Sequence, residues 1–269
     1  MATKRALALA LFVLLTCISV GCARADNTIL VNIQVTGANN MKPMIEELDK
    51  RGIKSTVWLD AEEISQNGEY IGELSAHGHE IAGKFDAEIT SETSYYEQKG
   101  ELLEILEVAS RYVDQKITGF RATRFTANEY TYTVMDELGM EYLVRSARDE
   151  LLSVYTFRPY RLEGHGFAIL PMPIRCAFGE SGSLCDTSSR GKLSPDQLRL
   201  YMCAAIDNNI KIDEPLILEW HPEITYPGDP EGWWDTFIAV LDYLENKGDA
   251  VQFVTANQIL EKYLYDKLQ

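Results

Sequence analysis

Ionisable side chains stand where predicted strands end in this sequence, and their types are those that move protons. His221 lies in LEWHPE, with Glu219 and Glu223 two residues to either side. In an extended chain these three side chains share one face. A carboxylate beside an imidazole raises the imidazole pKa, so the ring can donate a proton near neutral pH. The alternative interpretation is a structural histidine, hydrogen-bonded at a strand end.

A second group alternates along HGHEIAGKFDAE (His77–Glu88), where Lys84, Asp86 and Glu88 would point together in an extended loop. Asp86 or Glu88 could act as a general base, with Lys84 contacting a substrate. The alternative interpretation is a salt-bridged rim, the commoner outcome for a lysine beside two acids.

Arg121 ends an apolar strand in GFRATRF, where a buried guanidinium needs a charged partner. The sequence offers Glu219, Asp86 or Glu88 for this role. Arg124, three residues further on, competes for the same partner. Structural pairing is an alternative role for either arginine.

The elements that must position these groups alternate between strand and helix along the whole chain. Apolar runs and helical periodicity predict strands at 29–35, 54–59, 80–85, 117–121, 141–146, 216–220 and 251–255, with helices at 41–51, 68–76, 92–113, 129–138, 195–208, 233–246 and 258–265. Repeated β-α units predict a parallel sheet with right-handed crossovers. The ionisable groups then fall at the C-terminal ends of the strands, where barrels of this kind carry their chemistry.

The same segments, in their order and spacing, resemble the polysaccharide deacetylase family, also called the NodB-homology domain. The resemblance rests on KSTVWLDAEEI (Lys54–Ile64), HGHEIAGKFDAE, GFRATRF, ELGMEYLVRSA (Glu137–Ala147), LILEWHPE and VQFVTANQIL. It covers residues 28–269 and implies a single-domain α/β fold, an incomplete (β/α)7-type barrel. It places Arg121 at the family's arginine and His221 at the family's late, proton-donating histidine.

The resemblance also implies a divalent metal held by one Asp and two His, but the metal ligands are absent from this sequence. The family's H-x-x-x-H pair falls on Lys84 and Glu88, and no acid lies between Thr28 and Asn40, where the family has Asp-Asp. An ammonium donates hydrogen bonds and does not ligate a metal while it keeps its proton. We therefore expect no metal cofactor, with an all-oxygen site at Asp60 and Glu62 as the alternative.

The first 25 residues predict an export signal, with Lys4 and Arg5 before an apolar run and an A-x-A cleavage site ending at Ala25. A lipid anchor at Cys22 is the alternative, and residues 26–269 form the working domain. Removing three basic residues and no acids changes the net charge from −16 to −19 (−16 − 3). This charge disfavours nucleic acid and favours neutral or cationic partners, and the alternative interpretation is an adaptation for solubility. Export permits disulfides, and Cys176 and Cys185 bracket a Gly/Ser-rich loop that predicts a bridge.

Two main functions follow, and a metal-free amidase that acts on ring amides is a third option. The first is a secreted or surface-tethered hydrolase that acts on N-acetylated glycan or related non-peptide C–N amide bonds. The second is a catalytically inactive descendant that uses the barrel mouth to bind glycan or an exported partner.

Overall fold

A computed structural model describes residues 28–146, 157–172, 174–177 and 180–265 of the chain. The predicted signal segment, including Cys22 and Ala25, lies outside the described residues. No described helix is both long enough and apolar enough to cross a membrane.

Nine strands form one curled sheet in the order β10-β1-β2-β3-β4-β5-β7-β6, and β11 pairs with β1 beside this path. All pairings are parallel except that of β6 with β7. The strands are β1 (Ile29–Thr36), β2 (Thr56–Leu59), β3 (Glu80–Glu88), β4 (Gly119–Thr123), β5 (Tyr142–Ser146), β6 (Tyr160–Arg161), β7 (Ala168–Met172), β10 (Leu216–Trp220) and β11 (Val251–Phe253). The expected incomplete barrel is confirmed.

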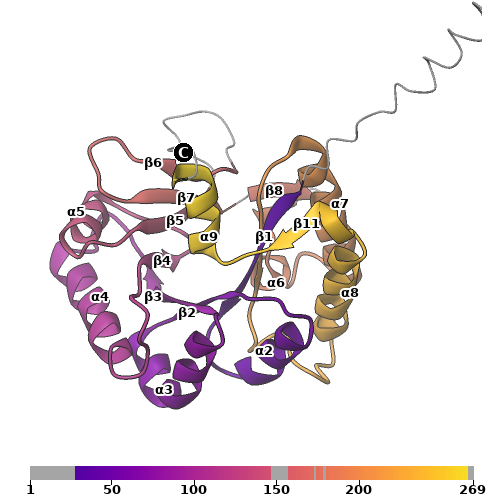
Figure 1. Cartoon of the computed structure of the whole chain (residues 1–269), viewed down its shortest axis with the longest axis horizontal. Helices are drawn as coiled ribbons and strands as arrows, with labels where there is room; N and C mark the ends of the chain where they lie inside the picture. Colours follow the sequence, from indigo (N-terminus) through magenta and orange to yellow (C-terminus); the bar gives the residue numbers. More distant parts are fainter. Residues whose placement is uncertain (1–27, 147–156, 173, 178–179, 266–269) are drawn as a thin grey trace, which may run out of the picture.

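Helices surround the sheet on its outer side (Figure 1). They are α2 (Met41–Lys50), α3 (Ala61–Ala76), α4 (Tyr95–Ala109), α5 (Glu129–Glu137), α7 (Pro195–Ile212) and α8 (Trp233–Glu245). Two shorter helices are not part of this outer layer: α6 (Asp186–Ser189) contacts β9 and β10, and α9 (Ala256–Leu260) contacts β1 and β7. Several helices begin at a reciprocal capping box, in which a side-chain oxygen satisfies an otherwise unpaired N–H of the first turn: Asp60, Ser94, Asn128, Ser194 and Thr255.

Alternation along β1 divides its side chains between two environments. Ile29, Val31, Ile33 and Val35 pack into the large core shared with the helices. The intervening residues face the barrel interior, where Asn32 Nδ2 donates to Thr56 Oγ1 at 3.0 Å. Trp58 and Tyr142 belong to a smaller inner core. The barrel is therefore filled by side chains in its middle and carries polar groups towards its ends.

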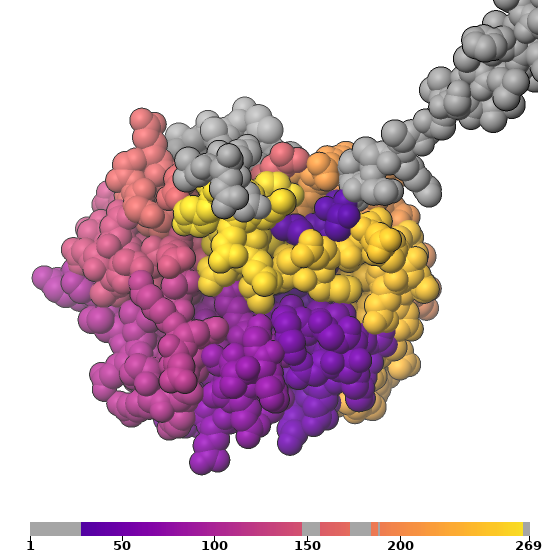
Figure 2. Space-filling view, viewed as in Figure 1, coloured from indigo at the N-terminus to yellow at the C-terminus, as the bar shows by residue number. Residues whose placement is uncertain are grey.

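The C-terminal segment closes the end of the barrel at which the strands begin. The backbone N–H of Ala256 donates to Thr56 Oγ1 at 2.9 Å, and that of Asn257 donates to Glu80 Oε2 at 3.1 Å. Thr56 and Glu80 are the first residues of β2 and β3. Figures 1 and 2 show the molecule with α9 and its neighbouring segment, in yellow, in front of the strands. The strands' C-terminal ends, with the predicted site, form the opposite mouth.

The predicted strands and major helices are all present, with shifted boundaries. The helix expected at 68–76 begins at Ala61, and the one expected at 92–113 is shorter, Tyr95–Ala109. The sequence did not predict the antiparallel hairpin of β8 (Ile174–Ala177) and β9 (Glu180–Ser183), or α6, which follows it. Irregular strands and turns were expected over 153–175, and within this range Ala168–Met172 is a full strand of the sheet, parallel to β5.

Candidate functional site

Arg121 and Glu219 form an ion pair inside the barrel mouth. Their side chains are 6% and 2% exposed, and Arg121 Nη1 donates to Glu219 Oε1. The hydroxyl of Thr36, the last residue of β1, donates to the same oxygen at 2.9 Å. Of the three partners proposed for Arg121, the structure selects Glu219. This carboxylate takes the charge-balancing role for which the sequence offers no acid on β1.

His221 follows β10 directly and is held by a carboxylate that the sequence analysis did not identify. Its Nδ1 lies 2.7 Å from Asp186 Oδ1, and its backbone N–H donates to Asp186 Oδ2 at 2.9 Å. The Thr225 hydroxyl donates to Oδ2 at 2.7 Å, so both oxygens of the fully buried Asp186 carboxylate are engaged. With Nδ1 bound to Asp186, the ring presents Nε2 towards Glu219 Oε1, 3.6 Å away.

Asp186 reaches this position because the chain after β9 runs alongside β10. Glu219 N donates to Leu184 O at 2.9 Å, and Cys185 and Glu219 form a parallel β-bridge. Asp186 is the first residue of α6 and lies directly beside His221. In the sequence Asp186 lies 35 residues before His221, in a segment with no periodicity. Its only local signal is an acid followed by Thr and Ser, which is typical of a short helix start.

Glu219 and His221, which face each other in the site, carry opposite charges. Burial would raise the pKa of Glu219, but Arg121 and His221 outweigh it, so this pKa is lowered from its usual 4.5. Burial would lower the pKa of His221. Cys185, Glu219 and the hydrogen bond with Asp186 outweigh it, so this pKa is raised well above the usual 6.5. At neutral pH Glu219 is therefore a carboxylate and His221 an imidazolium.

Lys84 lies on the inner wall beside Arg121, its register partner on β4, and is surrounded by acids. Its Nζ lies 3.3 Å from Asp60, 3.2 Å from Glu63 and 3.2 Å from Asp86. Burial acts to lower the Lys84 pKa, but these three carboxylates outweigh it and the pKa is raised. The ammonium therefore stays charged.

Two of the acids around Lys84 also begin a helix. Glu63 N donates to Asp60 Oδ1 at 2.8 Å, and Asp60 N donates to Glu63 Oε2 at 3.1 Å, which is the capping box of α3. Lys84 consequently ties β3 to the start of α3. This arrangement agrees with the interpretation of Lys84 and Asp86 as a structural, salt-bridged pair.

The remaining predicted residues lie on the rim. The 42%-exposed Glu88 side chain pairs with Arg124 at 3.1 Å, so Arg124 does not compete for Glu219. Glu223 is exposed in the turn after β10, so the expectation that it shares a face with Glu219 and His221 is wrong. The chain leaves the extended conformation at His221, which breaks the alternation on which that expectation depended. The base role predicted for Asp86 or Glu88 stays a prediction.

The groups at the family's metal-ligand positions do not fit a metal ion. The ammonium of Lys84 is fully engaged with carboxylates, and Thr36 ends β1 where the family has acids. The alternative at Asp60 and Glu62 is not formed, because Glu62 faces outward and pairs with Gln66 at 2.8 Å.

Among the described residues, one other grouping has the donor types for a metal, namely Cys185, Asp186 and His221. Its Asp186 Oδ1 and His221 Nδ1 are 2.7 Å apart, a hydrogen-bond distance. Two ligands at ~2.0–2.2 Å from a tetrahedral ion stand roughly 3.3 Å apart. The Asp186–His221 bond would have to open before an ion could enter.

The predicted Cys176–Cys185 disulfide is not formed. Cys185 carries a thiol, and its sulfur lies 2.7 Å from Thr187 Oγ1 and 3.8 Å from His221 Nδ1. Because β9 leads straight into the segment beside β10, Cys185 is directed into the site.

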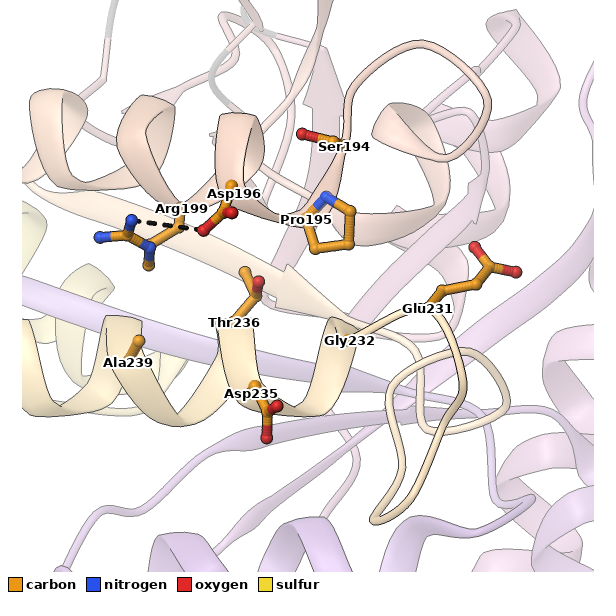
Figure 3. A pocket seen from close by; sticks show the side chains of 9 residues that line it. All are labelled: Ser194, Pro195, Asp196, Arg199, Glu231, Gly232, Asp235, Thr236 and Ala239. Carbon is orange, nitrogen blue, oxygen red and sulfur yellow. Dashed lines mark hydrogen bonds and ion pairs between the residues drawn. The ribbon is translucent and has the colours of Figure 1, made fainter.

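A separate hollow of about 400 Å³ lies between the starts of α7 and α8 (Figure 3). Its lining contains Arg199, ion-paired with Asp196 at 3.3 Å, together with Glu231 and Asp235. It contains neither histidine nor cysteine, and the acid–base groups described above lie at the barrel mouth instead.

This fold is shared with solved structures of polysaccharide deacetylases. A probable polysaccharide deacetylase from Pseudomonas aeruginosa PAO1 superposes with a TM-score of 0.70 at 15% identity, over 89% of this chain and 93% of that chain. Puue allantoinase gives 0.70 at 13% identity, over 90% and 93%. A CE4 family pseudoenzyme from Bacillus anthracis gives 0.54 at 11% identity, over 87% and 66%.

No protein-family model matches this sequence, and no curated protein matches it. At these identities the structural neighbours establish the fold. They include enzymes as well as a pseudoenzyme, so the activity must be argued from the residues at the mouth.

Proposed function

We propose that this protein is an exported hydrolase that cleaves an N-acetyl or related non-peptide C–N amide bond without a metal ion. The observation that carries the proposal is the facing pair of Glu219, ionised, and His221, protonated, with Nε2 and Oε1 3.6 Å apart. A base and an acid held in these states are what water attack on an amide requires.

In this reaction a water oxygen attacks the amide carbon while its proton passes to Glu219. The carbon–nitrogen bond then breaks, and the departing nitrogen takes the proton of His221 Nε2. The proton on Glu219 returns to His221 and restores both groups. Asp186 keeps Nδ1 protonated, so Nε2 is the nitrogen that exchanges protons. Arg121 and Thr36 hold Glu219 Oε1 in place.

We propose the class of substrate from the charged side chains at the barrel mouth. The mouth carries five carboxylates, from Asp60, Glu63, Asp86, Asp186 and Glu219, against the cations Lys84, Arg121 and His221. Together with the acidic composition this favours neutral glycan amides over anionic polymers. Export is proposed from Lys4, Arg5, the apolar run and the A-x-A sequence, with a lipid anchor at Cys22 as the alternative.

The second candidate is a non-catalytic module that binds glycan or an exported partner at the same mouth. It is favoured by the Lys84 cluster, which fills the region of the family's metal with an ammonium, and by the pseudoenzyme among the structural neighbours.

The test is hydrolysis of N-acetylated oligosaccharides and of small cyclic amides by protein treated with a chelator and checked for residual metal. We expect turnover that survives chelation and falls about 100-fold or more in Glu219→Gln and in His221→Gln. Turnover that needs added zinc or cobalt would overturn the metal-free mechanism. No turnover, with glycan binding retained in both variants, would establish the binding module.

A further inference from the structure

The loop after β4 has an unusual backbone. Arg124 and Phe125 both have positive φ, at 58° and 57°. Residues other than glycine rarely adopt this conformation, and each costs on the order of 1 kcal/mol or more. The turn is closed by Phe125 N donating to Ala122 O at 3.0 Å. Such a conformation persists where the surrounding structure gains from the side chain it places.

The exposed residue of the pair does not account for this strain. The Arg124 side chain is 76% exposed and, within the described part of the chain, pairs with Glu88 on the rim. Phe125, by contrast, is directed inward, where it packs against the inner core. Its ring centroid lies 4.9 Å from Arg121 Cζ.

Trp58 lies against the same guanidinium, with its ring centroid 5.5 Å from Arg121 Cζ. Stacking on aromatic faces suits the planar guanidinium and is stronger where water is excluded. The Nε of Arg121 is buried and has no hydrogen-bond partner among the described residues. Nη1 is engaged with Glu219, and Cζ lies over the rings of Trp58 and Phe125, so the guanidinium is held by one carboxylate and two aromatic rings.

We propose that Phe125 is a positioning residue, whose ring is placed by the strained turn so that it and Trp58 hold the Arg121 guanidinium in the orientation that presents Nη1 to Glu219. The proposal rests on the proposed hydrolase function, in which Glu219 is the base. Phe125 itself contacts neither water nor substrate in that reaction. Its effect passes through Arg121 to the carboxylate that faces His221.

The experiment compares Phe125→Leu, which removes the aromatic face and keeps apolar bulk, with Phe125→Tyr, which keeps the face. Arg124→Gly is the matched control, because it relieves positive-φ strain at the adjacent residue and leaves the ring in place. Two quantities are measured in each variant. One is the rate at which the Arg121 guanidinium rotates about its Nε–Cζ bond, by NMR, and the other is the kcat and KM of amide hydrolysis.

We expect Phe125→Leu to speed the rotation several-fold and to lower kcat about ten-fold with KM little changed, because a small misplacement of a reacting group acts on the transition state. Phe125→Tyr should restore both values, and Arg124→Gly should leave both unchanged while raising the melting temperature. Equal losses in Phe125→Leu and Phe125→Tyr, or unchanged rotation in Phe125→Leu, would overturn the proposal. If the wild-type protein hydrolyses nothing and the rotation still responds to Phe125→Leu alone, the proposed function fails and the positioning role stands.

Discussion

Arg121 and Glu219 are 98 residues apart in the sequence and form a buried ion pair across the barrel. Three strands, β1, β2 and β3, separate β4 from β10 in the sheet. The pair therefore connects two non-adjacent strands through the interior. It fixes the carboxylate that faces His221.

Replacing Glu219 by Gln should reduce the free energy of unfolding by about 3 kcal/mol, because a buried guanidinium loses its charged partner. Denaturant unfolding measures the change. Arg124→Ala, which breaks the exposed pair with Glu88, should cost only about 0.5 kcal/mol. The double variant Arg121→Met/Glu219→Met should recover much of the loss. A Glu219→Gln loss no larger than that of Arg124→Ala would contradict the buried pair.

Asp186→Asn should lower the pKa of His221, because a neutral amide stabilises the imidazolium less than a carboxylate does. NMR titration of the imidazole gives this value directly, whether or not the protein is active. If the proposed function holds, hydrolysis should fall about 100-fold, since the ring loses its orientation. Asp136→Asn is the control, because Asp136 contacts His165 on the surface at 2.6 Å. An unchanged His221 titration in Asp186→Asn would refute the positioning by Asp186.

The stabilisation from the Glu219–His221 pair should depend on pH in both directions. Glu219 has a lowered pKa, so its contribution is present above pH 4.5 and is lost as the pH falls through the folded-state pKa. His221 has a raised pKa, so its contribution is present below pH 6.5 and is lost as the pH rises through the folded-state value.

Between pH 4.5 and 6.5 the stability difference between wild type and Glu219→Gln/His221→Gln should therefore be largest. Thermal unfolding at a series of pH values measures it. A difference that does not vary with pH would mean that neither group changes its pKa on folding.

Lys84→Met should destabilise the fold by about 1–2 kcal/mol, because three carboxylates lose their common cation while remaining partly hydrated. Calcium or manganese should restore the melting temperature of this variant, since carboxylate oxygens suit hard divalent ions. The wild-type protein should not respond, because its ammonium already occupies the cluster. Lys99→Met is the control, since the Lys99–Glu137 pair lies at the surface. Restoration of Lys99→Met by the same ions would show that the effect is not specific to the cluster.

The sequence by itself determined the barrel fold and the positions of Arg121 and His221 at the barrel mouth. Apolar runs alternating with helical periodicity require parallel strands, and parallel strands bring their C-terminal ends to one mouth. Arg121 and His221 were predicted there because each directly ends or follows such a run. The sequence also showed that no acid lies between Thr28 and Asn40, because this observation concerns residue type and not geometry.

Only the tertiary structure decided which side chains meet. The sequence offered three acids as the partner of Arg121. The strand order places Glu219 across the barrel from Arg121 and so identifies it as the partner. The sequence around Asp186 did not indicate its contact with His221, because that contact depends on the segment after β9 aligning beside β10. The prediction that Glu223 shares a face with Glu219 and His221 was wrong, because side chains alternate between faces only while the backbone stays extended. Contacts between segments far apart in the chain are fixed by packing of the whole barrel, which local sequence does not encode.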